Sequence, residues 1–587
     1  MSDISHYTSH MKSFFQNRKN QTILLSLVIV ISVILLYLSV FNNPFVWDDM
    51  YGVVKNKYVH DIRSFLYFFS DNTYSGSGSI GANWRPLMLT VFSIIWKFWG
   101  GWVIPYHVVS IFLHATNAVL VFILLNRLFG KYWVAFLTAL VFAVHPLQTQ
   151  AIVYIAGLGD PLSAFFILVG VITYLKAKDN DKETRIFIIL SWLCFMCALL
   201  SKENAVMMPG LLLIADFFSR NKEEGFKANL YLSLKKLLPF AILFAFYILA
   251  RLTFLNFLSN VFESSFSIPF YERALVFFTT ICVYFRLIFA PLHLHMEYTF
   301  YWVHSLFEIK ALIGFAIITG FLTAIITQWK KRPAVSFGLA WFLIAYSPNA
   351  NLFMPTTNLF GEHWLYLSLI GFFIAIFSLG EELVKKGKFL LVALFLLFTW
   401  IGWISSVTID RNQDWETPVS ILSQTVKEEP KKVMVRIVLA SVYRDQGEYT
   451  KALENYAEAM RLEPYNYLVY SERALLYKKT GETDKMVADM ETSCQNDAIR
   501  SPSFKPLMSY YQKHKEFEKA EKMLLLSLSQ KGTPEIKLGT TIQLIANAVQ
   551  KKDKTLVKKY LGMADQYEKE IQNNWVTKLD LWLMNKD

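Results

Sequence analysis

Long uncharged stretches constrain this chain more than any other feature of its sequence. The first runs from Thr22 to Phe41 without a charged residue, and about 20 apolar residues are enough for one helix to cross a bilayer. Similar runs follow as far as residue 409. Backbone polar groups in lipid must be satisfied within their own segment, so runs of this kind form helices. The chain is therefore predicted to be an all-α, polytopic membrane protein.

The number of crossings follows from the lengths of these runs. They lie at residues 103–125, 132–159, 161–175, 186–201, 204–215, 237–250, 274–285, 311–329, 334–348, 364–380 and 389–409. Several are short for a hydrocarbon core about 30 Å thick, so we expect about eleven to thirteen helices. The composition agrees, since 54% of the residues are hydrophobic and only 18% are charged, which is unusual for a soluble domain.

Basic residues predict how the helices are oriented. Arg18 and Lys19 precede the first apolar run, so residues 1–21 are expected to be a cytoplasmic N-terminus. Lys385 and Lys386 precede the last run, which by the same rule places the rest of the chain outside. Clusters of this kind account for much of the net charge of +12, and we therefore expect the lipid bilayer and no nucleic acid as a partner.

Two adjacent carboxylates, Asp48 and Asp49, follow the first run directly, in a polar loop expected over residues 43–85 on the outer side. Acidic groups at a membrane face are costly to hold unless they handle a proton, a metal or a hydroxyl. The two aspartates are therefore the first candidate for a site. An ordinary solvated turn is an equally weighted alternative.

Other polar residues lie within or beside the apolar runs. His107 and His114 share one helical face, and buried imidazoles more often pack and hydrogen-bond than bind ligands. The remaining candidates at or near expected helix ends are His145, Asp160, Lys202 and Glu203. A local ion pair or snorkelling would explain the last two plainly. Their position among several outside loops nevertheless favours a shared polar cavity.

After residue 409 the composition changes to a charged, helical pattern that repeats. Ala440, Tyr443, Gly447 and Glu448 recur 34 residues further on as Ala474, Tyr477, Gly481 and Glu482. This period is the tetratricopeptide signature, and stacked helix pairs of this type form an α-solenoid that docks peptides or proteins. We expect a linker over 410–433 and the repeat domain over 434–587. A fourth helical pair is expected over 535–587, capped by Trp575, Leu579 and Leu583.

The polar motifs together resemble a known family. They are Val46-Trp-Asp-Asp49, Trp84-Arg-Pro86, His107 with His114 and Asn117, Phe142-Ala-Val-His-Pro146, Ser201-Lys-Glu203, Asn358-Leu-Phe-Gly-Glu362 running into Leu365-Tyr-Leu367, and Arg411 with Trp415. In this order and over nearly the whole chain they are similar to the transmembrane and tetratricopeptide-repeat-containing (TMTC) O-mannosyltransferases. The resemblance implies a GT-C-type catalytic domain over 22–409.

The resemblance also implies a reaction. A sugar, mannose in characterised members, would pass from a polyprenyl-phosphate donor to a protein Ser or Thr hydroxyl on the non-cytoplasmic face. A carboxylate would take the hydroxyl proton, with Asp49 weakly preferred over Asp48, and cationic or polar groups would stabilise the leaving phosphate. The expected donor-binding set is Arg85, His107, His114, His145, Asp160, Lys202, Glu203, Glu362 and Tyr366. Whether a divalent metal takes part is left open, and no other cofactor is implied.

Several positions depart from the family pattern. His363 and Leu158 stand where many members carry arginine, and Gln150 stands where they carry glutamate. These changes affect the expected phosphate-binding set and leave the aspartates untouched. The short repeat array suggests a prokaryotic plasma membrane, or the endoplasmic reticulum if the source is eukaryotic. A non-enzymatic scaffold or a transporter with a partner-recruiting repeat domain is the alternative function.

Overall fold

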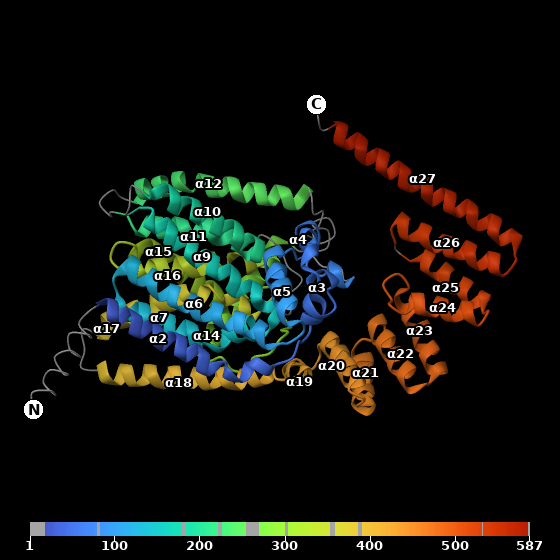
Figure 1. Ribbon diagram of the computed structural model, residues 1–587, viewed down its shortest axis with the longest axis horizontal. Helices are drawn as coiled ribbons and strands as arrows, with labels where there is room; N and C mark the ends of the chain where they lie inside the picture. Colours follow the sequence, from blue (N-terminus) through green and yellow to red (C-terminus); the bar gives the residue numbers. More distant parts are fainter. Residues whose placement is uncertain are drawn as a thin grey trace, which may run out of the picture. The chain divides into compact units, whose positions relative to one another are not determined.

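The computed structural model consists of helices joined by short connections (Figure 1). It describes residues 18–78, 83–178, 183–220, 226–253, 269–299, 303–352, 359–384, 390–530 and 532–584. Asn358, Lys385, Lys386, most of residues 1–21 and the side chains of Trp575, Leu579 and Leu583 lie outside this description. The chain divides into two compact units, Met1–Glu428 and Glu429–Asp587. The predicted all-α fold class is confirmed.

The first unit contains the membrane helices, and some of them are long and apolar enough to be candidate spans. Within the described ranges, seven helices are long and apolar enough to cross a membrane. A bent pair of helices raises this number to at most eight if the pair is one span. The seven are Arg18–Leu36 (α2), Ile104–Phe129 (α6), Ile155–Lys176 (containing α9, Gly159–Lys176), Thr184–Ser201 (α10), Leu230–Arg251 (within α12, Phe226–Thr253), Ile309–Gln328 (α15) and Leu390–Asp414 (α18). The bent pair joins Tyr132–Val144 (α7) to Pro146–Val153 at an angle of 56°.

Several apolar runs form broken or short helices. Pro146 cannot continue α7, so the apolar run 132–159 breaks there. Other apolar runs form helices of fewer than 18 residues: Pro86–Trp99 (α5), Met208–Phe218 (α11), Pro333–Tyr346 (α16) and Ser368–Val384 (α17). Phe270–Phe289 (α14) is a further long helix of this unit and carries Glu272 and Arg273 in its first turn.

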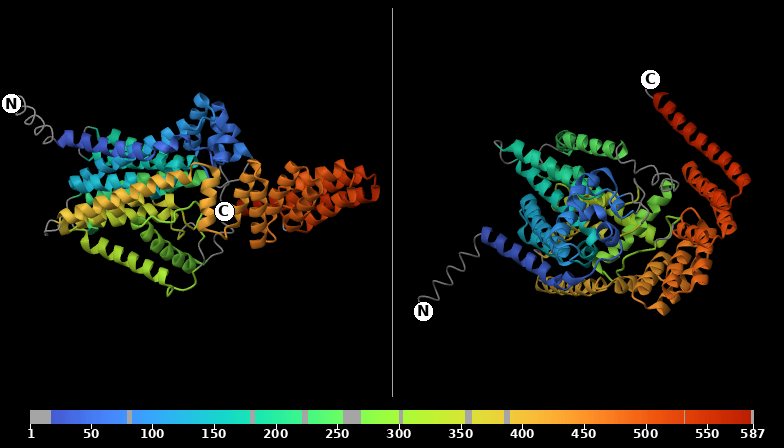
Figure 2. Two further views of the ribbon diagram at one scale, coloured as in Figure 1. Left: turned by 90° about the horizontal axis from the view of Figure 1, so that it is seen from below. Right: turned by 45° about the vertical axis from the view of Figure 1, so that its right-hand side comes forward.

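Helices α6 and α9 form the centre of this unit. In the most apolar stretch of each helix, 61% of the residues are buried for α6 and 78% for the span that contains α9. The corresponding value is 11% for both α15 and α18. Figures 1 and 2 show α12 and α18 at opposite edges of the bundle. Peripheral helices expose large apolar side chains such as Ile326 and Leu391, as expected of helices that face lipid. The polar candidates come from the central helices and their outer connections.

Two glycines allow α16 and α17 to pack closely. A Cβ atom on Gly371 would lie 2.3 Å from the carbonyl oxygen of Gly338, and one on Gly338 would lie 2.4 Å from the carbonyl oxygen of Gly371. Real Cβ atoms do not approach backbone this closely, so any larger residue must separate the helices. Small residues at such crossings are typical of packing between membrane helices.

We expect Gly371→Val to destabilise the membrane unit by about 1–3 kcal/mol through overpacking. The matched control is Gly380→Val on the same helix, because nothing lies within 4 Å of a Cβ added there. Thermal unfolding of the purified variants in one detergent measures the effect. A midpoint for the Gly371 variant equal to that of the Gly380 variant would show that the helices are not in close contact.

The second unit is an array of paired helices. They are Val433–Asp445 (α20), Tyr449–Leu462 (α21), Tyr467–Thr480 (α22), Thr483–Asp497 (α23), Phe504–Lys513 (α24), Phe517–Ser529 (α25), Pro534–Gln550 (α26) and Lys554–Met584 (α27). Gly447 and Gly481 end their helices with left-handed backbone, φ 84° and 79°, a conformation that glycine adopts without strain. At the equivalent place in the third repeat Lys515 has φ 58°. The third repeat therefore keeps the left-handed turn although lysine stands where the first two repeats have glycine.

The repeated side chains fill contacts between helices, as the sequence predicts. Ala440, Ala474 and Tyr511 are buried in the repeat cores. Tyr443 and Tyr477 pack, partly buried, against the core of the first two repeats. The aromatic residues that recur in register therefore stabilise the array and are not its docking surface.

Candidate functional site

The acidic turn is built on a strained backbone. Trp47 has φ 50°, which is rare for a bulky residue, and Met50–Val54 (η2) forms a single π-helical segment directly after the two aspartates. The Asp48 carbonyl accepts from the amides of Tyr51 at 3.0 Å and Gly52 at 2.7 Å. Backbone strain concentrates at functional sites. The turn gives the two neighbouring carboxylates different surroundings.

Asp49 is fully buried and is bonded to the backbone. Its Oδ1 accepts from the Ala156 amide at 2.7 Å, and its Oδ2 accepts from the Val46 amide at 2.9 Å. Burial raises the pKa of Asp49 to about 8, although the backbone amides favour its ionised form. Both oxygens are engaged inside the protein, so this residue ties the loop after α2 to the segment before α9. The choice between Asp49 and Asp48 as the base stays a prediction.

Asp48 is half-buried and faces a polar cluster. Its Oδ2 accepts from the Tyr74 hydroxyl at 3.2 Å, and its amide donates to the Tyr154 hydroxyl at 3.0 Å. Burial raises the pKa of Asp48, while the two tyrosines and the positive charge of Arg85 oppose that rise. Asp48 is thus the aspartate that an incoming group can reach.

Arg85, whose charge acts on Asp48, belongs to a cluster of two ion pairs. The Nε and Nη2 atoms of Arg85 donate to the two carboxylate oxygens of Glu203 at 3.0 and 2.7 Å. Lys202 Nζ donates to both oxygens of Asp160 at 2.7 Å. The backbone at Lys202 is extended, with φ −157°, and the side chains of Lys202 and Glu203 reach different partners. Lys202 and Glu203 are therefore not a self-neutralised pair, because each bonds to a residue far away in the sequence.

The charges in this cluster act on one another. Burial would raise the pKa of Glu203, but the Arg85 guanidinium outweighs burial and holds it well below the usual range. Burial lowers the pKa of Lys202, and the Asp160 carboxylate opposes this. Clusters of mutually perturbed groups are enriched at functional sites. Arg85 and Lys202 remain cationic and are held in place by carboxylates.

His363 completes the cluster as a neutral group. Burial, with the nearby charges of Lys202 and Arg85, holds the pKa of His363 well below its usual value. Its Nδ1 lies 2.9 Å from Gln150 Oε1. An amide oxygen only accepts, so Nδ1 carries the proton. Two of the positions that depart from the family pattern, 150 and 363, are thus hydrogen-bonded to each other.

A small cavity of about 20 Å³ opens next to the Lys202–Asp160 pair. This volume is on the order of one water molecule, so a larger ligand requires side chains to move. The lining residues are Asp160, Ser163, Ala164, Lys202, Asn204, Met207, Ala345, Asn349, His363, Trp364, Tyr366 and Leu367. The cavity joins residues from α9, the α10–α11 connection and the segment before α17.

The three histidines predicted to bind the donor are buried hydrogen-bonding groups. His114 Nδ1 bonds to the Tyr366 hydroxyl at 2.8 Å, and its Nε2 bonds to the Ala143 carbonyl at 3.1 Å. His145 is engaged at both nitrogens, and His107 Nε2 bonds to the Asn43 carbonyl at 2.9 Å. These contacts fit the packing interpretation better than a ligand role. Tyr366 lines the cavity, but its hydroxyl points into this helix core.

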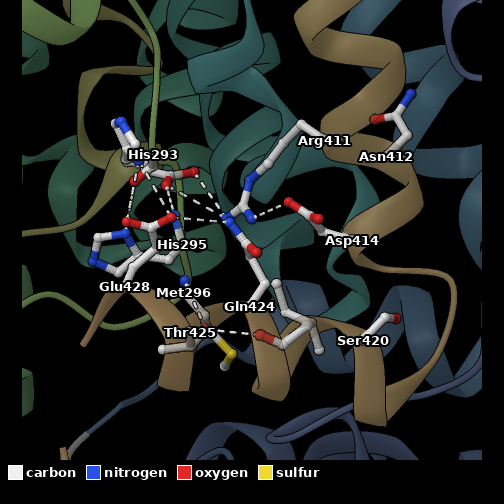
Figure 3. A network of polar contacts seen from close by, with 12 residues as sticks. His293, His295, Met296, Arg411, Asn412, Asp414, Ser420, Gln424, Thr425 and Glu428 are labelled. Atoms are coloured by element: carbon white, nitrogen blue, oxygen red, sulfur yellow. Dashed lines mark hydrogen bonds and ion pairs between the residues drawn. The ribbon is translucent and has the colours of Figure 1, made fainter. Parts of the chain in front are cut away.

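Glu362 lies in a separate buried network rather than in the cavity. It accepts from the Tyr298 hydroxyl at 2.7 Å and the His295 amide at 2.8 Å, with Arg411 Nη2 at 3.3 Å. Figure 3 shows Arg411 reaching Asp414 at the end of α18, above Pro418–Glu428 (α19). The expected linker over 410–433 is therefore largely helical, and its first part belongs to the membrane unit. Glu362 holds the end of α18 in place.

Some site residues were not found from the sequence. Tyr74 and Tyr154 both bond to Asp48, and Asn349 and Ser163 line the cavity. Nothing in their spacing separates them from the many other tyrosines and small polar residues of the chain. Among the described residues no three His, Cys, Asp or Glu side chains are arranged to hold a metal ion.

The fold and the cluster define a class: an integral membrane protein with a C-terminal tetratricopeptide-repeat unit and a charged cavity at one end of its helix bundle. Residues 440–481 match the family model for a TPR repeat. The chain is a distant homologue of the TMTC protein O-mannosyltransferases.

Three relatives show the extent of this similarity. Protein O-mannosyl-transferase F38B6.6 of Caenorhabditis elegans is 26% identical over 475 residues, which cover 76% of this chain and 63% of the relative. TMTC1 and TMTC3 of Homo sapiens are 23% and 22% identical over 75% of this chain, and 55% and 51% of their own lengths are covered. The chain thus spans between about half and just under two thirds of these relatives.

Proposed function

We propose that this protein transfers a sugar, most simply mannose, from a polyprenyl-phosphate donor to a Ser or Thr hydroxyl of a protein on the non-cytoplasmic face. The observation that carries the proposal is the position of Asp48. It is only partly buried, it is hydrogen-bonded to Tyr74, and the charge of Arg85, which Glu203 holds in place, acts on its carboxylate. The homology to protein O-mannosyltransferases supports the same reaction.

Asp48 is proposed as the general base. The acceptor hydroxyl oxygen bonds to the anomeric carbon while the bond from that carbon to the phosphate oxygen breaks. The hydroxyl proton passes to Asp48, and the electron pair leaves with the polyprenyl phosphate. Proton transfer of this kind requires the carboxylate within hydrogen-bond reach of the hydroxyl. In this scheme Asp49 is a positioning residue that fixes the turn.

Arg85 and Lys202 are proposed to stabilise the leaving phosphate. A guanidinium has five N–H donors and an ammonium has three, and the carboxylate partners of these residues occupy two donors of each. Cations fixed before the substrate arrives lower the cost of forming negative charge in the transition state. Asp160 and Glu203 thus act through the cations and not on the sugar.

The test is reconstitution of the full chain in liposomes with radiolabelled polyprenyl-phosphate mannose and a mixture of Ser- and Thr-containing acceptor proteins. We expect label to appear on hydroxyl side chains and to be released by a mannosidase. A protein that moves a labelled solute across the membrane without forming a glycoside would instead support the transporter alternative. The outer orientation and the prokaryotic membrane stay predictions here.

The repeat unit is proposed to select the acceptor. A chain ending at Glu428 is expected to bind the lipid-linked donor as the full chain does, because the charged cluster lies wholly in the first unit. Transfer to a natural acceptor protein should fall by at least about 10-fold, because docking on a linked domain raises the local acceptor concentration. Transfer to a short peptide should change little. Unchanged glycosylation of the natural acceptor would disprove the docking role.

A further inference from the structure

A second cluster of charged side chains lies at the opposite end of the bundle from the cavity. Helix α9 begins beside Asp160 and ends at Lys176 after 18 residues, a rise of about 27 Å. This length approaches the thickness of the hydrocarbon core. The cluster beyond Lys176 therefore lies at the other face of the membrane from Asp48.

The centre of this cluster is Asp216, at the end of α11, which is fully buried. Its Oδ1 accepts from the Tyr174 hydroxyl and from Lys178 Nζ, both at 3.1 Å. Its Oδ2 accepts from Arg220 Nε and from the Ser233 hydroxyl, both at 2.6 Å. The carboxylate is thus bonded from α9, α11 and α12, and it fixes two cations at defined positions.

The cluster carries more positive than negative charge. Lys178 and Arg220 share one carboxylate. Burial lowers the pKa of Lys178, and the charges of Arg220 and Lys236 lower it further, whereas the Asp216 carboxylate raises it. Arg220 Nη2 is buried and has no hydrogen-bond partner in the described part of the chain. A buried donor without a partner is costly. The Lys178 and Arg220 side chains as a whole remain 23% and 13% exposed, so an oxygen-rich anion can approach them and supply the missing negative charge.

The surroundings favour a lipid over a soluble anion. Large apolar side chains are exposed on the two helices that begin at this end: Ile186 and Ile189 on α10, and Tyr231, Leu234 and Leu238 on α12. An amphiphile can place acyl chains along such surfaces while its headgroup remains at the interface. Clustered basic residues between membrane helices are typical of anionic headgroup sites.

We propose that Lys178 and Arg220, oriented by Asp216, bind the phosphate of an anionic phospholipid at the face of the membrane opposite the catalytic cluster. Arg220, whose Nε is held by Asp216, would place its positive charge beside the phosphate oxygens. Lys178 would add a second positive charge. The site is independent of the proposed glycosyl transfer.

The test uses the full-length protein in detergent, titrated with phosphatidylglycerol or phosphatidylcholine and observed by native mass spectrometry. We expect phosphatidylglycerol to bind at least about 10-fold more tightly than the zwitterionic lipid, because its phosphate is not offset by choline. The preference should disappear in Lys178→Gln and in Asp216→Asn combined with Arg220→Gln. The double variant removes Arg220 together with the carboxylate that it shares with Lys178, so its thermal unfolding is compared with that of Lys178→Gln, which keeps the Asp216–Arg220 pair, to separate loss of folding from loss of lipid binding.

The matched control is Arg332→Gln. Arg332 also pairs with a carboxylate, Glu382, at 2.7 Å. It lies at the same end of the bundle, since Trp329 packs against Phe217 with ring centroids 5.6 Å apart. This variant should keep the preference for phosphatidylglycerol. Loss in all variants alike would indicate general electrostatics and overturn the site, as would an undiminished preference in the Lys178 and Arg220 variants. Displacement of the lipid by inorganic phosphate would assign a free phosphate instead.

Discussion

Asp48→Asn is expected to lower the rate of sugar transfer by roughly 10²–10⁴-fold while leaving donor binding almost unchanged. The substitution keeps the shape of the side chain and its contact with Tyr74, but an amide cannot accept the hydroxyl proton. Single-turnover transfer from labelled donor measures the rate. Equilibrium binding of the same donor separates a chemical defect from a binding defect.

Asp49→Asn is the matched control, with the same chemical change one residue away. An amide can accept from only one of the two backbone N–H groups that Asp49 now bonds, so we expect a stability loss of about 1–3 kcal/mol. The rate per folded molecule should fall far less than in the Asp48 variant. Equal, unimpaired transfer by both variants would make the acidic pair structural, and the opposite ranking would return the base to Asp49.

The pH dependence gives a second measurement for Asp48. A general base acts only when it is deprotonated, and burial raises the pKa of Asp48 above its ordinary value. Activity should therefore be lost as the pH falls through a value higher than about 3.9, the usual pKa of aspartate. This acid limb should be absent from the residual activity of Asp48→Asn. An acid limb unchanged in the variant would assign it to another group.

Lys202→Met should destabilise the membrane unit by about 3–5 kcal/mol, because it leaves the Asp160 carboxylate buried without its cation. Both side chains are more than nine tenths buried, so solvent screens the pair weakly. The double variant Asp160→Asn with Lys202→Met removes both charges and should recover most of the stability. It should still lack transfer, since the leaving phosphate has lost one cation.

Thermal unfolding and transfer activity are measured on the same samples for these variants. Arg461→Met is the control for a surface pair, because Arg461 is largely exposed and pairs with Glu458. Such exposed pairs contribute little to stability, because solvent screens them. If the double variant were as unstable as Lys202→Met, the loss would come from packing. If it transferred sugar normally, Lys202 would have no part in the reaction.

The sequence predicted the second unit better than the first. The 34-residue offset located the helix pairs because Gly447 and Gly481 are needed for the same left-handed turn. Hydropathy located the apolar runs of the first unit, but it does not show that Pro146 breaks one of them or which runs form helices of fewer than 18 residues. A short apolar run has the same hydropathy whether it crosses the membrane or forms a buried helix.

The sequence indicated which residues lie in the candidate site better than it indicated which residues they contact. Asp48, Arg85, Lys202 and their carboxylates do come together. Spacing could not rank two adjacent aspartates, because the difference lies in which amides surround Asp49. It also could not show that Lys202 and Glu203 bond to different partners, since that depends on extended backbone at Lys202.

The crossed ion pairs bear on how this protein can change over evolutionary time. Arg85 depends on Glu203, and Asp160 depends on Lys202, so a change at one position leaves a buried charge alone unless its partner changes too. Because Lys202 and Glu203 are adjacent, both pairs also depend on the same short stretch of backbone. Positions 85, 160, 202 and 203 should therefore covary as a set among related chains, and an insertion between α10 and α11 should be selected against even though it touches neither aspartate of the acidic turn.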